Sequence, residues 1–506
     1  MELLNRLSKY AITSSKRKAF INSNTNEAIS YEVLNDISDR LAAYIQKTYH
    51  DKVPIVVYGH KSPLMIASFL GCVKAGHPYC PVDISMPDER LKDILEVSGA
   101  TLLIKINDTV VKCKNNLTAS EIINLPSTKE LYLSLQVDDN DVFYIIFTSG
   151  STGKPKGVQI TAKCLDNFLD WMESIAKRER FDINPIFLNQ APFSFDLSVM
   201  DVYSSLYLGG TIYSLDKTVQ EDIGLMYEKL RDSGVTAWVS TPSFMNMCLI
   251  NSSFNQEMLP DINSFLFCGE VLTNKTAREL HKRFPNAKVI NTYGPTESTV
   301  AVTEVVVTEE MANAEAPLSI GKSKPGTKIF IMDDKYIYPG LPDNEKGEII
   351  IAGNTVAKGY LNRSDLTAEK FFIINTPEGE LCAYKTGDKG WKNNELLYYL
   401  GRMDFQLKIN GFRIELGDIE NNIIKLDNIK ACVVLPIEKN GVNKGLAAFL
   451  CLEESIDNDF EYSQNIRKQL KEKIPHYMIP KKYIFIEDMP KTNNGKVDRY
   501  ALKELL

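Results

Sequence analysis

Hydrophobic positions in the first third of the chain alternate between helical and strand spacing. Apolar residues recur every three or four positions over 30–46, which predicts an amphipathic helix with a buried stripe of Leu34, Ile37, Leu41, Ala42 and Ile45. A short apolar run predicts a strand over 53–58, and helical spacing over 64–75 ends at Gly76, a residue type that often terminates helices. The alternation predicts α/β layers with largely parallel sheets, including further strands over 143–147, 237–240, 264–267 and 288–291.

The pattern changes after residue 318, where short apolar runs are separated by glycine and proline turns. Runs over 328–332, 347–351 and 396–400 predict a small β-rich subdomain. Beyond residue 404 the chain reads as strand, helix, strand, helix, strand, an α+β pattern long enough for a small independent domain. We therefore expect an α/β protein with a large N-terminal domain over 1–403, a β-rich subdomain over about 318–400 and a small α+β C-terminal domain over 404–506.

Length, charge and cysteine content narrow the class of protein. A chain of 506 residues is too long for one compact core, so several domains are expected. Its 58 basic and 65 acidic side chains leave a net charge of −7, which argues against a general nucleic-acid-binding protein. Residues 1–20 contain no apolar signal-peptide core, and no run approaches the roughly 18 apolar residues of a membrane span. The nine cysteines and five histidines show neither a disulfide framework nor metal-ligand spacing, so we expect a cytoplasmic protein that is not membrane-embedded.

The sharpest local signal is a polar loop between two apolar segments. An apolar run from Tyr144 leads into glycine, serine and threonine over 148–153, and Lys154 and Lys156 follow. Glycine permits close backbone approach, while amides, hydroxyls and ammonium groups can surround a phosphate chain. The loop is not a Walker A motif, because Pro155 stands where that motif has Ser or Thr.

This loop resembles the phosphate-binding signature of the adenylate-forming superfamily, which includes acyl-CoA synthetases, luciferases and amino-acid adenylation domains. The resemblance covers nearly the whole chain, because five further motifs stand in the family order at 73–83, 291–297, 384–388, 401–413 and 494–499. It implies an ATP-dependent ligase in which a carboxylate attacks the α-phosphorus of ATP and pyrophosphate leaves. In such a displacement the protein mainly aligns the reactants and offsets negative charge.

The same resemblance implies an ATP site spread over several motifs. Tyr293 would stack on adenine, Asp388 would accept hydrogen bonds from the ribose hydroxyls, and Glu297 would ligate Mg²⁺. The implied catalytic residues are Lys496, Thr296 and Arg402. The complete implied ATP site consists of Thr148, Ser149, Gly150, Ser151, Thr152, Gly153, Lys156, Asn291, Thr292, Tyr293, Gly294, Pro295, Thr296, Asp388, Tyr399, Arg402 and Lys496.

Three residues near or within the C-terminal domain have implied roles in a two-state cycle. Lys496 would reach the attacking carboxylate and the α-phosphate during adenylation, where its positive charge stabilises the developing negative charge. Asp404 would be the hinge about which a mobile C-terminal domain rotates. Gly411 would line the pantetheine tunnel of the thioester-forming state.

The segment 193–201 separates amino-acid activators from fatty-acid activators within the superfamily. Asp196 matches the aspartate that pairs with the substrate's ammonium group, but it also stands where a helix N-cap is expected, and both roles can coexist. The implied pocket is small and apolar, which favours a short aliphatic side chain, and consists of Leu197, Met200, Leu266, Cys268, Thr292, Val300 and Ala301. Ordinary core packing is the alternative for Cys268.

A closer resemblance rests on the segments 58–60, 189–201 and 265–270. It is to the branch of the superfamily that activates D-alanine and transfers it to the phosphopantetheine thiol of a separate, small acidic carrier protein, for the D-alanylation of lipoteichoic acid. Selectivity for the D isomer is implied by this resemblance alone. The implied D-alanine contacts are Asp196, Met200, Cys268, Val300 and Lys496.

Other readings of the sequence remain open. A basic stretch is either a docking surface for the carrier or a solvated helix face, and it comprises Arg467, Lys468, Lys471, Lys473, Lys481 and Lys482. An adenylation enzyme for another small amino acid shares all the motifs. An acyl-CoA synthetase is disfavoured, because Asp196 would place a charge opposite an aliphatic acid. A nucleotide-binding regulator without turnover is disfavoured by the presence of Lys156, Glu297, Asp388, Arg402 and Lys496.

Overall fold

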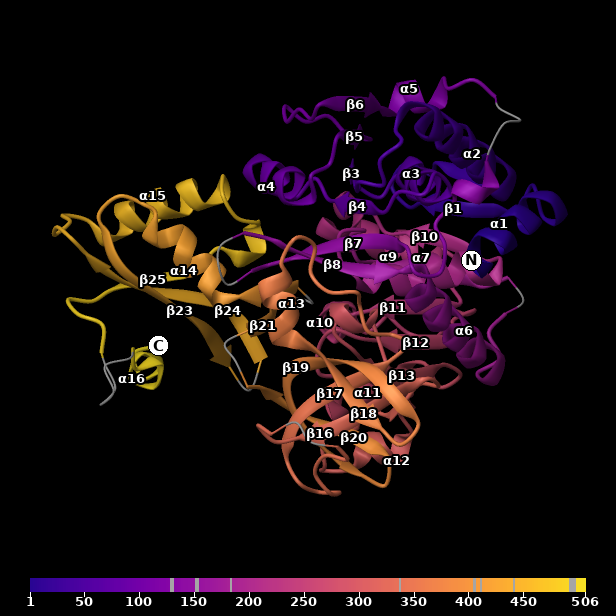
Figure 1. Cartoon of the computed structure of the whole chain (residues 1–506). Coiled ribbons are helices and arrows are strands. Elements are labelled where there is room, and N and C mark those ends of the chain that lie inside the picture. Colours follow the sequence, from indigo (N-terminus) through magenta and orange to yellow (C-terminus); the bar gives the residue numbers. More distant parts are fainter. Residues whose placement is uncertain are drawn as a thin grey trace.

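The chain folds into a large body of stacked sheets and helices with a smaller body standing to one side, drawn in orange to yellow in Figure 1. The computed structural model describes residues 1–127, 132–150, 154–182, 184–335, 338–403, 406–409, 412–439, 442–490 and 497–506.

The largest sheet has nine strands and is parallel through its middle. Its order is β15 (Lys322–Ser323), β14 (Thr303–Val306), β13 (Lys288–Tyr293), β12 (Ser264–Phe267), β11 (Ala237–Ser240), β9 (Ile186–Asn189), β10 (Thr211–Ser214), β1 (Lys18–Asn22) and β2 (Ala28–Ser30). The strands from β13 to β1 run parallel, and β14, β15 and β2 are antiparallel at the edges. The predicted strands over 237–240, 264–267 and 288–291 are confirmed. Because carboxyl ends of parallel strands share one edge, the segments after β9, β12 and β13 meet there.

A second sheet of six strands lies in the same body. Its order is β6 (Asn115–Thr118), β5 (Leu102–Lys105), β3 (Ile55–Tyr58), β4 (Tyr79–Val82), β7 (Val142–Thr148) and β8 (Lys156–Thr161). All neighbours are parallel except β7 and β8, which pair antiparallel with Thr148 opposite Lys156. The polar loop predicted to bind phosphate therefore connects the ends of two adjacent strands.

Helices of the large body follow the expected apolar patterns. The predicted helix over 30–46 is α2 (Tyr31–Thr48); the Ser30 hydroxyl caps it by accepting from the Val33 amide, and all five predicted stripe residues are buried. α3 (Pro63–Lys74) and α7 (Leu197–Leu208) are buried along almost their whole length, and both belong to the core that joins the two sheets. The other helices are α1 (Glu2–Thr13), α4 (Asp88–Ser98), α5 (Ala119–Ile123), α6 (Ala162–Arg178), α8 (Lys217–Glu221), α9 (Ile223–Arg231), α10 (Pro242–Cys248), α11 (Asn274–Arg283), α12 (Glu309–Asn313) and α13 (Ser364–Lys370).

An antiparallel sheet follows in the region predicted to be β-rich. Its strands are β16 (Thr327–Met332), β17 (Gly347–Gly353), β18 (Phe371–Thr376), β19 (Gly379–Asn393) and β20 (Leu396–Arg402). The three strands predicted over 328–400 are confirmed as β16, β17 and β20. Pairing of β19 with β20 sets Asp388 opposite Arg402.

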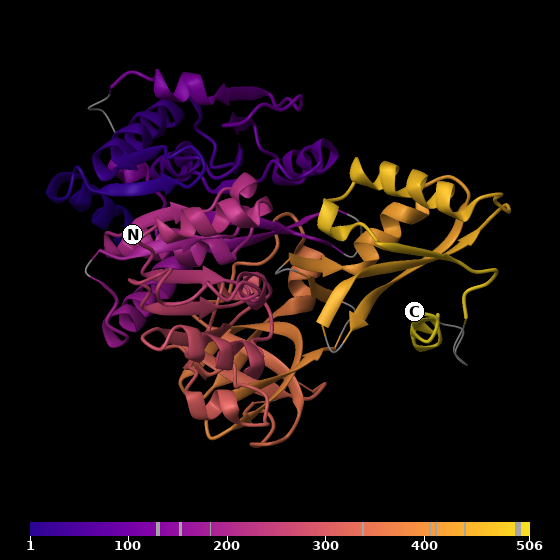
Figure 2. The ribbon, with the colours of Figure 1, turned by 180° about the vertical axis from the view of Figure 1, so that it is seen from behind.

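The small body has its own apolar core. Its elements are β21 (Gln406–Ile409), β22 (Phe412–Glu415), α14 (Leu416–Ile424), β23 (Ile429–Lys439), β24 (Val442–Leu452), α15 (Asp459–Lys471), β25 (Lys482–Phe485) and α16 (Arg499–Lys503). Alternate residues of β23 pack against α14 and α15 on one face and against α16 on the other. Figure 2 shows the ribbon of this body from behind, with helices on both sides of its strands.

The predicted order of this region is wrong in two respects, because two antiparallel pairs replace single strands and a short helix follows the last strand. β21 pairs with β22, and β23 pairs with β24, so the observed order is strand, strand, helix, strand, strand, helix, strand and a final short helix. The signal for both hairpins is an Asn-Gly dipeptide between two strand-like runs, at 410–411 and at 440–441. Asp404, predicted as the hinge, and Gly411, predicted to line the tunnel, lie outside the described residues, and the domain boundary at 404 also stays a prediction.

Candidate active site

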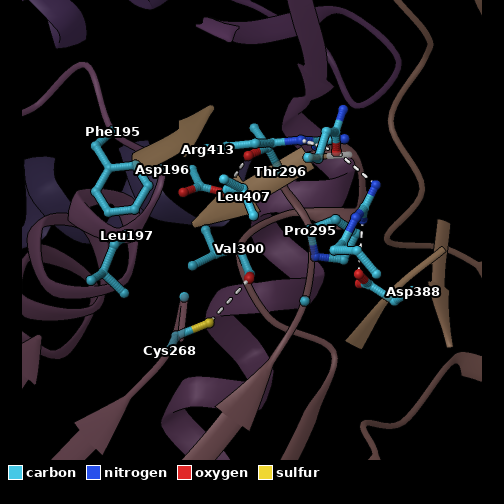
Figure 3. Close-up of a pocket in the computed structure, with 14 residues that line it drawn as sticks. Phe195, Asp196, Leu197, Cys268, Pro295, Thr296, Val300, Asp388, Leu407 and Arg413 are labelled. Atoms are coloured by element: carbon cyan, nitrogen blue, oxygen red, sulfur yellow. Dashed lines mark hydrogen bonds and ion pairs between the residues drawn. The ribbon is translucent and has the colours of Figure 1, made fainter. Parts of the chain in front are cut away.

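The candidate site lies where the small body meets the large one. The ends of β7, β9, β12 and β13 reach it from the large sheets, β19 and β20 from the antiparallel sheet, and β21 and β22 from the small body. Figure 3 shows one of its cavities with the side chains that line it.

Asp196 and Thr296 meet at the centre of this site. The Thr296 hydroxyl donates to Asp196 Oδ2 over 2.7 Å, and both side chains are buried (Figure 3). Asp196 occupies the N-cap position of α7, but its side chain makes no capping hydrogen bond. The carboxylate is therefore directed towards Thr296 and the cavity, and of the two roles considered from sequence, capping is not observed.

The apolar end of the cavity is small, and its lining residues are tightly packed. Cys268, at the carboxyl end of β12, donates through Sγ to the Val300 carbonyl over 3.6 Å. Val300 has a φ of 66°, a left-handed conformation that costs a residue of this kind about 1–3 kcal/mol. The turn is closed by Gly294, where an added Cβ would stand 2.6 Å from the Ala301 Cα. Leu407 of β21 also lines the cavity, so the small body supplies part of its lining.

Met200 was predicted to narrow the same pocket; it belongs to the apolar core that also contains Cys268 and Val300, and its role stays a prediction. Its side chain is fully buried in the core between the sheets and is not among the residues that line this cavity. Met200 stands one turn after Asp196, which places both residues on the same side of α7, a helix that is buried almost all round.

A second group of polar side chains surrounds Asp388. Its Oδ1 accepts from Arg402 Nη1 over 2.8 Å, and its Oδ2 accepts from the Tyr293 hydroxyl over 2.6 Å. Burial, with Asp388 next to it, raises the pKa of Tyr293 well above its usual value, so the phenol remains a donor. The ring of Tyr399 lies 6.3 Å from that of Tyr293. These groups form a buried polar corner with two aromatic rings beside it.

Asn291 and Thr292 hold β13 in place next to this corner. The Asn291 side chain donates to the Ser319 carbonyl over 2.8 Å, and the Thr292 hydroxyl donates to the Phe267 carbonyl over 2.8 Å. Both side chains are almost fully buried. Their observed contacts fix the strand that leads to Thr296.

The end of β7 presents the described part of the phosphate-loop motif. The Thr148 hydroxyl is buried and has no hydrogen-bond partner among the described residues, which is uncommon for a buried hydroxyl and fits a group that awaits a ligand. The Ser149 hydroxyl donates to the Arg413 carbonyl and accepts from the Glu415 amide, each over 3.0 Å. Gly150 is buried beside it, whereas Ser151, Thr152 and Gly153 lie outside the described residues.

Glu297 is a fully buried carboxylate in the short 3₁₀ helix Thr296–Ser298. Tyr360 donates its hydroxyl to Oε1 over 2.7 Å, and Arg413 pairs with Oε2 over 2.6 Å. Burial alone would raise the pKa of Glu297, but the positive charges of Arg413 and Lys156 outweigh it and lower the pKa to about 2. Glu297 is therefore ionised and fits a hard cation such as Mg²⁺. No group of three His, Cys, Asp or Glu side chains that could hold a metal ion occurs in the described part of the chain.

Sequence reasoning did not assign roles to the polar side chains of the β21–β22 hairpin. Gln406 Oε1 accepts from Arg402 Nη2 over 2.7 Å and from Arg413 Nε over 3.0 Å, and Gln406 Nε2 donates to Glu415 Oε1 over 2.7 Å. Glu415 also pairs with Lys156 Nζ over 2.5 Å. A polar network therefore runs from Asp388 through the hairpin to the phosphate loop. The available signal was the alternation of polar residues along 406–415, which is typical of strands with one polar face.

The remaining predicted residues divide into two sets. Lys496 lies outside the described residues, so its expected role stays a prediction. In the basic stretch, Lys468 and Lys471 of α15 are exposed, whereas Arg467 donates to the carbonyls of Pro480 and Lys481 and so has a structural role. No helix among the described residues is both long and apolar enough to cross a membrane.

Two family profiles match this chain. Residues 8–361 match the AMP-binding enzyme family, and residues 418–496 match the AMP-binding enzyme C-terminal domain. The first match covers most of the large body, including the Asp196 and Thr296 positions, and the second falls in the small body.

Similar proteins agree with these matches. The D-alanine–D-alanyl carrier protein ligase of Bacillus licheniformis is 44% identical over 509 residues, covering 100% of this chain and 99% of that protein. The protein of the same name from Bacillus cereus is 44% identical over 511 residues, covering 99% of each. Among solved structures, a nonribosomal peptide synthetase protein containing adenylation and PCP domains has a TM-score of 0.84 at 25% identity, covering 100% of this chain and 84% of that one. A Vibrio cholerae adenylation domain in complex with glycyl-adenosine-5′-phosphate has a TM-score of 0.81 at 22% identity, covering 100% and 96%, and shows the shared fold.

Proposed function

The chain belongs to the D-alanine–D-alanyl carrier protein ligases, an adenylate-forming family of AMP-binding enzymes, and we propose how its cleft carries out the two steps of that reaction. In the first step the D-alanine carboxylate attacks the α-phosphorus of ATP, which forms D-alanyl adenylate and releases pyrophosphate. In the second step the D-alanyl group passes to the phosphopantetheine thiol of the carrier protein, and AMP leaves.

The D-alanine subsite is centred on Asp196. Its buried carboxylate can pair with the α-ammonium group of the amino acid, whose positive charge would stabilise it. Cys268, Val300 and Leu407 bound a space that suits a methyl side chain. Because pockets of this kind discriminate by shape, a larger side chain would clash with this wall.

The single observation that carries the proposal is the 2.7 Å contact between Thr296 and Asp196. A hydroxyl at this distance from the ammonium-binding carboxylate can donate to an α-phosphate oxygen while the amino acid occupies the adjacent subsite. The two reactants are thereby held in attack geometry, which is the main contribution that a protein makes to phosphoryl displacement. Asp388 would bind the ribose hydroxyls, and Tyr293 and Tyr399 would flank the adenine.

The pyrophosphate end of ATP is assigned to the β7–β8 connection. Lys156 and the hydroxyls of Thr148 and Ser149 offer positive charge and donors there. Glu297 would hold Mg²⁺, which supplies positive charge to the phosphate oxygens when bound. Lys496 would stabilise the charge that develops between carboxylate and α-phosphate, a role that rests on the family resemblance.

Two further parts of the proposal concern the biological setting. All nine cysteines are free thiols, which supports a cytoplasmic location. Delivery of the D-alanyl group to lipoteichoic acid by way of the carrier rests on the resemblance alone.

Amino-acid-dependent ATP–pyrophosphate exchange tests the proposed activity. We expect exchange with D-alanine to exceed exchange with L-alanine, glycine, D-serine and L-serine. Preference for another of these acids would keep the adenylation chemistry and overturn the D-alanine subsite. Absence of exchange with all five would contradict the adenylation proposal itself.

A further inference from the structure

A buried lysine between the two large sheets contacts the strand that leads to Asp196. Lys61 lies in the turn between β3 and α3 and is only 1% exposed. Its Nζ donates to the carbonyls of Asn189 and Gln190, over 2.9 Å each, and to Asn189 Oδ1 over 2.8 Å. These three acceptors match the three N–H donors of an ammonium group. One charged side chain from the six-stranded sheet therefore holds the carboxyl end of β9 in the nine-stranded sheet.

Asn189 extends this contact to the start of α7. Its Oδ1 also accepts from the Ser214 hydroxyl over 2.9 Å, while its Nδ2 donates to the Ala191 carbonyl over 3.1 Å and to Asp201 Oδ1 over 2.8 Å. The two acceptor sites and two donors of the carboxamide are thus all used. Both ends of the β9–α7 connection, whose last residue is Asp196, are tied to this one fully buried side chain.

Asp201 supplies the opposite charge in the same cluster. It is fully buried, and its Oδ2 has no hydrogen-bond partner among the described residues. Burial raises the pKa of Asp201 and lowers that of Lys61, and the charge of each residue opposes the effect on the other. Because an uncompensated charge in the interior is costly, the two residues depend on each other.

The backbone at Lys61 adopts a conformation that is uncommon for a residue with a side chain. Its φ is 40°, in the left-handed region, and Asn22 Nδ2 donates to its carbonyl over 3.1 Å. Such conformations are costly and persist where the surrounding structure holds them. A glycine would adopt this turn without strain, so the lysine indicates that its side chain is needed here.

We propose that Lys61 is a positioning residue for amino-acid activation, because it fixes the β9–α7 connection and thereby holds the Asp196 carboxylate in place for the α-ammonium group of D-alanine. Asp196 depends on this support, since its side chain makes no capping hydrogen bond within its own helix. Lys61 is not among the residues that line the cavity in Figure 3, so its effect on the amino acid is indirect. The inference rests on the proposed function, which assigns the ammonium group to Asp196.

Separate KM values for D-alanine and ATP in pyrophosphate exchange test this role. Lys61→Met removes the ammonium group from the full-length enzyme and retains most of the volume of the side chain. We expect the KM for D-alanine to rise about tenfold, with the KM for ATP and kcat changed less than about twofold, because only the carboxylate that binds the amino acid is displaced. An unchanged KM for D-alanine in folded Lys61→Met would overturn the proposal.

Lys74→Met is the matched control. Lys74 is 2% exposed, and its Nζ likewise donates to three oxygens, Asn35 Oδ1, Ser38 Oγ and Asp39 Oδ1, over 2.7–2.9 Å. All three acceptors belong to α2 rather than to the β9–α7 connection. This variant should unfold at a lower temperature and keep the wild-type KM for D-alanine. A KM raised as much as in Lys61→Met would show that the rise follows from general destabilisation, and would contradict the proposal.

The double variant Lys61→Met/Asp201→Asn separates positioning from charge balance. It removes both buried charges, and asparagine keeps an oxygen that can accept from Asn189, so the double variant should unfold at a higher temperature than Lys61→Met. It also provides a folded protein to measure if the single variant fails to fold. The contacts from residue 61 to the end of β9 stay lost, so the KM for D-alanine should remain raised. Recovery of the wild-type KM together with stability would mean that the pair serves the fold only, and would overturn the proposal.

Asp196→Asn distinguishes failure of this inference from failure of the proposed subsite. A raised KM for D-alanine in Asp196→Asn with an unchanged KM in Lys61→Met would remove the positioning role and keep the ammonium subsite. An unchanged KM in Asp196→Asn would remove the subsite on which the inference rests.

Discussion

The hydroxyl of Thr296 lies 2.7 Å from the carboxylate of Asp196, although 100 residues separate the two in the chain. Asp196 starts a buried helix after β9, and Thr296 follows β13, so the contact exists only because both strands end at the same edge of one sheet. The contact places the group expected to bind an ammonium ion next to the group expected to bind a phosphate. The predictions below depend on this placement and on the hairpin that covers it.

Asp196→Asn should abolish most amino-acid activation. The substitution keeps the shape of the side chain but removes the charge opposite the D-alanine ammonium, and loss of one partner of a buried charge pair costs about 2–5 kcal/mol. We expect kcat/KM for D-alanine in pyrophosphate exchange to fall by roughly 30-fold or more, with little change in ATP binding.

Asp222→Asn is the matched control for that variant. Asp222 caps α9 through a 3.0 Å hydrogen bond to the Leu225 amide, a role that asparagine fills equally well. Its exchange activity should equal that of the wild type. Wild-type exchange in Asp196→Asn would show that Asp196 does not bind the ammonium group.

Cys268→Ala should widen the apolar end of the cavity. The thiol bounds the same space as Val300, and a change of about one methylene in such a pocket alters discrimination by roughly tenfold. We expect exchange with L-alanine and D-serine to rise relative to exchange with D-alanine. In Cys248→Ala, which empties a fully buried core position, stability should fall while the ratios among amino acids stay constant. Unchanged ratios in Cys268→Ala would exclude Cys268 from the specificity pocket.

Protonation of Glu297 at low pH should lower the free energy of unfolding of the ligand-free enzyme. Its pKa is lowered from 4.5 to about 2, because the charges of Arg413 and Lys156 outweigh the opposing effect of burial. A depressed carboxyl pKa contributes stability that is present above pH 4.5 and is lost as the pH falls towards 2, here roughly 3 kcal/mol in full. The unfolding free energy of wild type minus that of Glu297→Gln should therefore shrink as the pH is lowered from about 5 to about 3 in urea titrations. A difference independent of pH in this range would contradict the assigned ion pair.

Arg90→Met should slow the transfer of the D-alanyl group to the carrier without slowing adenylate formation. Arg90 on α4 pairs with Asp418 on α14 over 3.0 Å, and both side chains are buried between the two bodies. Loss of the arginine leaves the buried Asp418 carboxylate with its hydrogen bond from Asn422 but without its ion-pair partner, which costs about 3–5 kcal/mol in the observed arrangement of the two bodies. We expect slower carrier loading with pyrophosphate exchange retained, and partial recovery of loading in the double variant Arg90→Met/Asp418→Leu. Loss of exchange to the same extent as loading would show that the pair supports the fold rather than one orientation.

Local sequence signals predicted much of the framework. The strands over 237–240 and 264–267 match β11 and β12, and the stripe of α2 is buried as expected, because short apolar runs and helical periods reflect burial directly. The small body was less predictable. Its two hairpins depend on cross-strand pairing, for which the Asn-Gly dipeptides at 410–411 and 440–441 were the available local signal in the sequence.

The site was predictable in its residues but not in its contacts. Asp196, Thr296, Asp388 and Arg402 were all identified from motifs, and the structure brings them into one cleft. The pairing of Glu415 with Lys156 depends on how two bodies meet across 259 residues, which no local pattern encodes. The left-handed turn at Val300 is likewise held by tertiary contacts, because valine disfavours that conformation on its own.

Transfer to the carrier is the most direct test of the central claim, that this cleft forms D-alanyl adenylate and passes the D-alanyl group to a thiol. Purified enzyme would be incubated with ATP, magnesium and either D-alanine or L-alanine in the presence of the phosphopantetheinylated carrier, and the carrier would be measured by intact-mass spectrometry. The account predicts a mass increase of one alanyl group that requires ATP, is favoured by D-alanine and is reversed by hydroxylamine, as expected for a thioester. A carrier of unchanged mass, with exchange activity intact, would contradict it.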